Sequence, residues 1–165
     1  MSVNSGQPTA GTCAAAAPHE SVGNNQAMPD LEPIEQYLRP EVPPDDVIVV
    51  VRGGPIAAEK IVEHAAREAR DRSYNGAPMH SVSVSLTVGG RSLDDLLAGP
   101  LASRSTFAQT TVGLLREAKY TLLPTYAAPH YDLLLASGSY DDATKLLRCF
   151  SDAQPNPFKA RRGQK

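Results

Sequence analysis

The chain has 165 residues, of which 41% are hydrophobic and 5% aromatic, and this predicts one ordinary domain with an aliphatic core. The formal net charge is −2, and residues 47–158 carry as many acids as bases, which argues against a duplex-DNA-binding domain, because such domains usually present a basic face. No apolar run is long enough to span a membrane, so we expect a soluble, cytoplasmic protein.

Composition separates the two ends of the chain from its middle. Residues 1–29 are low in complexity and rich in Ser, Gly, Asn, Gln, Ala and Pro, which predicts disorder. Residues 30–45 are predicted to form either a solvated linker or a linker with a short helix docked on the domain. The prediction of a docked helix is based on apolar residues at helical spacing, namely Leu31, Ile34, Tyr37 and Leu38. We expect a single domain over residues 46–153 and a basic C-terminal tail over residues 154–165.

The most informative stretch is the apolar run 47–51, which is followed by Arg52, Gly53, Gly54 and Pro55. Such a run predicts a strand that is buried on both faces. Two glycines allow a tight turn, and proline is tolerated at a first helical position. The unpaired amides of that helix start, together with the Arg52 guanidinium, predict an anion site.

An amphipathic helix near residues 55–72 and an alternating strand over residues 79–88 come next. One face of this strand carries His80, Val82, Val84, Leu86 and Val88, and the other carries Ser81, Ser83, Ser85 and Thr87. The hydroxyl face is either solvated or the wall of a cleft. Because one helix connects the two strands, we expect them to run parallel and to be neighbours or near-neighbours.

The second half of the domain is predicted to contain two helices, two strands and a last helix. Ser92 begins a short helix with a capping-box pattern, and a second helix is predicted near residues 105–118. Strands over residues 120–125 and 130–136 resemble a hairpin, and Ser139 begins a last helix. The predicted order is strand, helix, strand, two helices, two strands, helix. This order indicates an α+β fold with a mixed sheet of about four strands.

Four polar residues could converge at strand ends: Arg52, His80, His130 and Asp132. Histidine moves protons near neutral pH, and arginine binds phosphate through two hydrogen bonds. We therefore expect a phosphate-bearing ligand at the turn that follows Arg52, and a toxin-like, metal-independent ribonuclease as one activity of such a site. In this hypothesis His130, His80 and Asp132 are catalytic.

No metal site is predicted. His80, His130 and Asp132 follow no ligand motif, and Cys13 and Cys149 are too few and too far apart for a zinc site or a disulfide framework. The glycine pair also lacks the lysine and hydroxyl residue of a phosphate-binding loop.

A resemblance to ADP-ribosyltransferases gives an alternative. A strand that ends in Arg52-Gly53, followed by a strand with Ser81-Val-Ser83 and Ser85, is similar to the first two motifs of that family. The resemblance implies that Arg52 would hold the nicotinamide-side ribose and phosphate of NAD and that Ser83 would brace the site. The family's catalytic glutamate has no counterpart, since the corresponding region offers only Asp132.

A third reading is non-catalytic. An acidic N-terminal arm, a neutral domain and a basic tail also describe a module that binds a protein partner. The catalytic and non-catalytic hypotheses predict different positions for Arg52, His80, His130 and Asp132. If these residues share one pocket, catalysis is favoured, and if they are scattered, a surface for a protein partner is favoured.

Overall fold

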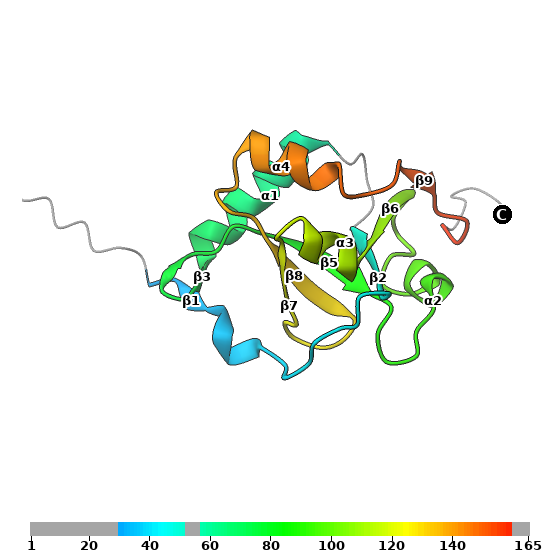
Figure 1. The fold of residues 1–165 in the computed structure, drawn as a ribbon, viewed down its shortest axis with the longest axis horizontal. Coiled ribbons are helices and arrows are strands. Elements are labelled where there is room, and N and C mark those ends of the chain that lie inside the picture. Colours follow the sequence, from blue (N-terminus) through cyan, green and yellow to red (C-terminus); the bar gives the residue numbers. More distant parts are fainter. Residues whose placement is uncertain (1–29, 52–56, 160–165) are drawn as a thin grey trace, which may run out of the picture.

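The computed structural model describes residues 30–51 and 57–159, which form an α+β fold as predicted (Figure 1). The segment Arg52 to Pro55, with its predicted turn and anion site, lies outside the described residues. The predicted disordered segment 1–29 lies outside them as well. Within the described part, none of the helices is both long and apolar enough to cross a membrane.

The main sheet has six strands in the order β7-β8-β5-β2-β6-β9, which exceeds the predicted four. All neighbours in it are antiparallel, so the sheet is not mixed. Its strands are β2 (Ile48–Val51), β5 (Ser81–Leu86), β6 (Thr106–Thr111), β7 (Thr121–Leu123), β8 (His130–Leu134) and β9 (Gln154–Pro155). As predicted, the apolar run β2 is an inner strand, because it pairs with β5 on one side and β6 on the other.

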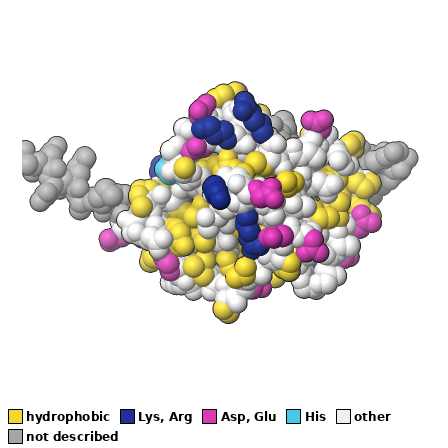
Figure 2. All heavy atoms as spheres, in the orientation of Figure 1, with side chains coloured by type: hydrophobic (Ala, Val, Ile, Leu, Met, Phe, Trp, Pro, Cys, Tyr) yellow, Lys and Arg dark blue, Asp and Glu magenta, His cyan; other side chains and the backbone are white. Residues whose placement is uncertain are grey.

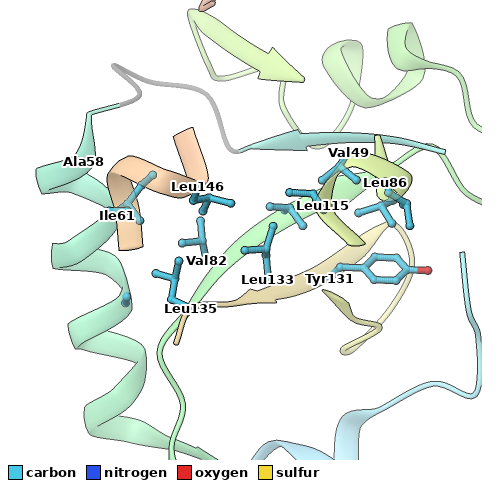
Figure 3. Close-up of a cluster of buried hydrophobic side chains, with 14 residues drawn as sticks. Val49, Ala58, Ile61, Val82, Leu86, Leu115, Tyr131, Leu133, Leu135 and Leu146 are labelled. Carbon is cyan, nitrogen blue, oxygen red and sulfur yellow. The ribbon is translucent and has the colours of Figure 1, made fainter. Parts of the chain in front are cut away.

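The expected parallel arrangement of the first two major strands is wrong, since β2 and β5 run antiparallel. The helix α1 (Ala58–Asp71) lies across the strand ends in Figure 3 instead of running back along them. After α1 the chain forms a hairpin of β3 (Arg72–Tyr74) and β4 (Ala77–Pro78). Asn75 and Gly76 close this hairpin with φ of 51° and 75°, a backbone that suits the Asn-Gly pair. The chain thus enters β5 at the end where β2 stops.

The prediction of a helix near residues 105–118 is also wrong for the first half of that segment. Residues 106–111 form β6, and only Val112–Glu117 is helical (α3). Three β-branched residues, Thr106, Thr110 and Thr111, favour an extended backbone. The last four residues of β6 pair with β2, and its first two pair with β9. The Thr111 hydroxyl then accepts a hydrogen bond from the Leu114 amide and caps α3.

The main core lies between one face of the sheet and the helices α1 and α4 (Tyr140–Leu147), as Figure 3 shows. Its fully or almost fully buried members include Val49, Ile61, Ala65, Val82, Val84, Leu86, Leu115, Tyr131, Leu133 and Leu146. Even-numbered residues of β5 point into this core. The odd-numbered serines of β5 therefore belong to the opposite face.

That opposite face has apolar clusters at both ends. The helix α2 (Leu93–Ala98), capped reciprocally by Ser92 and Asp95, covers a cluster that includes Val50 and Phe107. At the other end the short 3-10 helix η1 (Ile34–Tyr37) contributes Ile34, which is 0% exposed, to a second cluster. Polar residues occupy the strip between these two clusters.

Residues on both sides of the expected 46–153 domain pack against it. Near the N-terminus, β1 (Glu32–Pro33) pairs with β3 in a small second sheet. After residue 153, β9 pairs with β6, and the buried Asn156 side chain donates hydrogen bonds to the carbonyl oxygens of Leu97 and Leu101 at 3.2 and 3.0 Å. The start of the expected tail is therefore part of the folded domain.

On the face drawn in Figure 2, acidic and basic side chains lie side by side and form no continuous basic stripe. This mixture agrees with the balanced charge of the sequence. A duplex-binding surface would require clustered positive charge on the face that meets the phosphates.

Candidate functional site

The pairing of β5 with β8 decides which side chains of the polar strip meet. Two backbone hydrogen bonds define the ladder, one from the Leu86 amide to the Pro129 carbonyl at 3.0 Å and one from the Leu135 amide to the His80 carbonyl at 2.8 Å. Hydrogen-bonded and non-hydrogen-bonded pairs alternate along an antiparallel ladder. The odd-numbered residues of β5 therefore occupy the narrow, non-hydrogen-bonded pairs, with Cα atoms about 4.5 Å apart. These pairs are Ser81 with Leu134, Ser83 with Asp132, and Ser85 with His130.

The serine row of β5 is buried rather than solvated. Ser81 is 0% exposed, and Ser83 and Ser85 are 8% and 9% exposed. Of the two readings of this hydroxyl face, the cleft wall fits and the solvated face does not. A row of hydroxyls in the interior needs polar partners, since unpaired buried polar groups are costly.

Asp132 is the centre of a buried hydrogen-bond network. Its carboxylate is 0% exposed and accepts a hydrogen bond from the Thr125 hydroxyl at 2.8 Å and a long one from the Ser81 hydroxyl at 3.4 Å. The Thr125 oxygen also lies 2.9 Å from His130 Nδ1. Asp132, Thr125 and His130 thus form a continuous relay.

The hydrogen bonds of the relay connect the tautomer of His130 to the charge of Asp132. With Asp132 ionised, the carboxylate only accepts hydrogen bonds, and Thr125 donates its one hydroxyl proton to it. The Thr125 oxygen then accepts from a protonated Nδ1 of His130. In the neutral imidazole of that arrangement, Nε2 is the basic nitrogen.

A pocket of about 100 Å³ lies against this relay. It is lined by Ser83, Val84, Ser85, Pro100, Leu101, Pro129 and His130. Hydroxyl and imidazole groups come from the two strands, and the apolar walls come from the loops after α2 and before β8. This volume has room for a small polar group such as a phosphate.

Arg39 in the N-terminal arm holds the loop that carries Thr125. Its guanidinium donates hydrogen bonds to the carbonyl oxygens of Thr125 at 2.6 Å, Tyr126 at 2.7 Å and His130 at 3.2 Å. Glu41 accepts from the same guanidinium at 2.6 Å and also accepts from the Tyr131 hydroxyl. The arm therefore fixes the backbone on both sides of the turn between Thr125 and His130.

These contacts predict an acid-sensitive contribution to stability from Glu41. Hydrogen bonds from Arg39 and Tyr131 hold the pKa of Glu41 below its usual value of 4.5. A carboxyl whose pKa is lower in the folded than in the unfolded protein stabilises the fold above its unfolded pKa. That contribution is lost as the pH falls through the folded pKa.

Glu41→Gln is therefore expected to destabilise the protein near neutral pH and to lose that effect below about pH 4.5. Urea unfolding of both proteins between about pH 7 and pH 3 measures the difference. The comparison isolates Glu41, because the other carboxyls are common to both proteins. A difference in unfolding free energy that stays constant over this range would contradict the assignment.

His80 lies away from this site. It sits at the opposite end of the β5–β8 pair from His130, five residues along β5 from Ser85, or roughly 17 Å at the usual rise of a strand. Its Nδ1 is buried without a hydrogen-bond partner in the described part of the chain and lies against Gly138. The structure thus brings His130, Asp132 and Ser83 together and does not bring His80 to them. The predicted ligand residues Arg52, Gly53 and Gly54 lie outside the described residues.

A second, larger pocket of about 270 Å³ lies beside β7. Its charged side chains are already engaged, since Arg116 binds Asp45 and the Pro43 carbonyl, and Glu41 binds Arg39. No histidine lines it. The smaller pocket is therefore the better candidate for chemistry.

Thr125 and Arg39 were not identified from the sequence as site residues. Thr125 follows the strand break at Pro124, and nothing in its neighbours indicates that it lies between His130 and Asp132. The pairing of β7 with β8, a bridge to Leu38 and the hydrogen bond from Arg39 hold it there.

No group of three or more histidine, cysteine, aspartate or glutamate residues is arranged to hold a metal ion in residues 30–51 and 57–159. Comparison with protein-family models, with curated proteins and with solved structures found no match.

Proposed function

We propose that the protein binds a phosphate-bearing ligand in the pocket formed by β5 and β8, and cleaves a phosphate ester there without a metal, with RNA as the candidate substrate. One observation carries this proposal: the buried relay from Asp132 through Thr125 ends in a histidine that lines the pocket. The relay positions His130 as a base at the pocket, whose volume of about 100 Å³ is enough for a phosphoryl group.

In the proposed reaction His130 acts as the general base. Its Nε2 takes the proton of the attacking hydroxyl as the new O–P bond forms, and the imidazolium returns that proton to the leaving oxygen as the old P–O bond breaks. RNA carries a suitable hydroxyl at its 2′ position, next to the phosphate. Ser83 offers a hydroxyl to the phosphate oxygens from the pocket floor. Positive charge is expected from Arg52, which follows the last described residue of β2 in the sequence.

His80 has no part in this proposal, because it lies at the far end of the two strands. One histidine therefore serves as base and then as acid. Asp132 is a positioning residue, since it is fully buried and acts through Thr125.

The test is cleavage of a single-stranded RNA oligonucleotide in the presence of EDTA. We expect His130→Ala to lower the rate by about 10²–10⁴-fold, the usual contribution of a general base. His64→Ala is the matched control, because His64 lies on α1 away from the pocket, and it should change the rate less than twofold. Equal rates for the wild type and His130→Ala, or no cleavage by the wild type, would refute the proposal.

NAD binding is the second candidate, and the sheet order favours it. The strand that precedes Arg52 (β2), the Ser-x-Ser strand (β5) and the strand of Asp132 (β8) are direct neighbours. The two motifs that resemble ADP-ribosyltransferases thus begin on adjacent strands, as a shared NAD site requires. Asp132 is buried and hydrogen-bonded, so this candidate is a binding protein rather than a transferase. NAD should then raise the melting temperature, and Ser83→Ala should reduce that rise.

A further inference from the structure

The site contains a hydroxyl of the protein's own, opposite the proposed base. Ser85 forms a narrow pair with His130 across the two strands and lines the same pocket. The Cβ atoms of directly opposite residues lie about 4.5–5.5 Å apart, and closest in narrow pairs. At that spacing, rotation of the two side chains can bring the serine oxygen and an imidazole nitrogen to hydrogen-bond distance.

Two neighbours flank the His130 side chain. The Thr125 hydroxyl oxygen lies 2.9 Å from Nδ1 of His130, and β5, which carries Ser85, is the strand beside β8 in the sheet. His130 thus lies between Thr125 of the relay and Ser85 of the neighbouring strand.

We propose that Ser85 is the nucleophile of this site and that it forms a phosphoserine intermediate. The inference rests on the proposed function, because it assumes that a phosphate ester enters the pocket with His130 as its base, and it puts Ser85 in place of the RNA 2′-hydroxyl as the attacking group. A serine hydroxyl is a weak nucleophile until an adjacent base removes its proton, and a third group usually orients that base. Here His130 is the base, and Thr125 with Asp132 orients it.

The bonds and protons balance in two steps. Ser85 Oγ attacks phosphorus while its proton passes to His130 Nε2, and the leaving oxygen departs with that proton. Water then attacks the phosphoserine, giving its proton to His130, and the Oγ–P bond breaks as Ser85 regains a proton. The products are an alcohol and a phosphate with one ester bond fewer.

The walls of the pocket suit such an intermediate. Ser85 is 9% exposed, and Pro100, Leu101 and Pro129 form the apolar part of the lining. Apolar walls reduce the contact of a bound group with water and strengthen its electrostatic interactions. The volume of about 100 Å³ is enough for a phosphoryl group.

A class of substrate follows from this assignment. Because the protein supplies the nucleophile, the ligand needs no 2′-hydroxyl, and phosphate esters that lack one should also be cleaved. RNA cleaved by its own 2′-hydroxyl gives a 2′,3′-cyclic phosphate first. Attack by Ser85 gives a linear phosphate without a cyclic intermediate.

The first experiment is labelling of the full-length protein with diisopropyl fluorophosphate, followed by fragmentation mass spectrometry. We expect one diisopropylphosphoryl group on Ser85 of the wild type and none on Ser85→Ala or His130→Ala. Mapping the label on the wild type needs no variant, so the test survives if Ser85→Ala does not fold. No label, or a label on another residue, overturns the inference.

The second experiment separates this inference from the proposed function. Wild type and Ser85→Ala are compared on an RNA oligonucleotide and on bis(4-nitrophenyl) phosphate. Loss of both activities in a folded Ser85→Ala protein supports the inference. Cleavage of RNA to a cyclic phosphate by both proteins overturns it and leaves the proposed function standing. No cleavage of either substrate by the wild type refutes both.

Discussion

Val49→Asp is expected to leave no cooperatively folded protein at 25 °C. Val49 is 0% exposed in the middle of β2, with Leu86 and Thr110 as its partners on the two neighbouring strands. Burying a carboxylate costs several kcal/mol even after the protein relaxes, and the lost valine contact adds about 1.5–3 kcal/mol. Together these penalties are comparable with the whole stability of a domain, about 5–15 kcal/mol.

The Thr110 hydroxyl offers only partial relief to such a carboxylate. It is buried and lacks a hydrogen-bond partner in the described part of the chain, so it can donate one bond to Asp at position 49. One neutral donor does not replace the hydration of an ion. Circular dichroism and thermal melting measure the outcome.

Val42→Asp is the matched control, because Val42 is 83% exposed. The same chemical change at this surface position should alter the unfolding free energy by no more than about 0.5 kcal/mol. A soluble Val49→Asp protein with a sharp melting transition would show that β2 is not the central strand.

Thr125→Val is expected to lower the unfolding free energy by about 2–4 kcal/mol, because hydrogen bonds to charged groups contribute about 1.5–3 kcal/mol each. Valine keeps the shape of threonine and removes the hydroxyl that joins His130 to Asp132. The carboxylate would remain buried and keep only the long bond from Ser81. Chemical denaturation at neutral pH measures the loss.

The same substitution should also change the state of the imidazole. Without the Thr125 oxygen nothing in the relay holds the proton of His130 on Nδ1, so the two neutral tautomers should mix. Imidazole ¹⁵N chemical shifts distinguish the tautomers directly. This readout reports on the relay even if the protein has no hydrolytic activity.

Two control variants separate the relay from a general packing effect. Thr125→Ser keeps the hydroxyl and should recover most of the lost stability and the original tautomer. Thr121→Val makes the same change at an exposed position of β7 and should cost no more than about 0.5 kcal/mol. If Thr125→Ser were as unstable as Thr125→Val, the methyl group rather than the hydroxyl would be the important part of the side chain.

The proposed chemistry depends on the N-terminal arm as well as on the two strands. Arg39 binds three carbonyl oxygens of the segment from Thr125 to His130, and no other described side chain does so. A site assembled on a loop needs such anchoring, because small displacements of a catalytic group are costly. In this proposal the arm is therefore part of the site.

Elements with strong local signals could be predicted from the amino-acid sequence alone. Periodicity identified β2, α1, β5 and β8, and serine caps located the starts of α2 and α4, because side-chain pattern and capping act within a few residues. The alternation of residues 81–86 correctly assigned the serines to one face and the aliphatic residues to the other. The α+β fold followed from these elements.

Long-range strand pairing set two features that local patterns do not encode. The Thr-rich segment 106–111 has a mixed pattern, and pairing with β2 made it a strand. The antiparallel direction of β5 depends on where the chain goes after α1, and no local signal encodes that path. Both errors concern partners that are distant in the sequence.

The candidate site also depends on both local sequence signals and long-range strand pairing. His130, Asp132 and Ser83 were identified from the sequence as polar groups, but their assembly depends on strand register, because a shift of one residue would move every side chain to the other face. Register also brought Thr125 into the relay and left His80 at the other end of the strands. Residue types can be read from the sequence, whereas distances between strands are set by the long-range hydrogen-bond ladder.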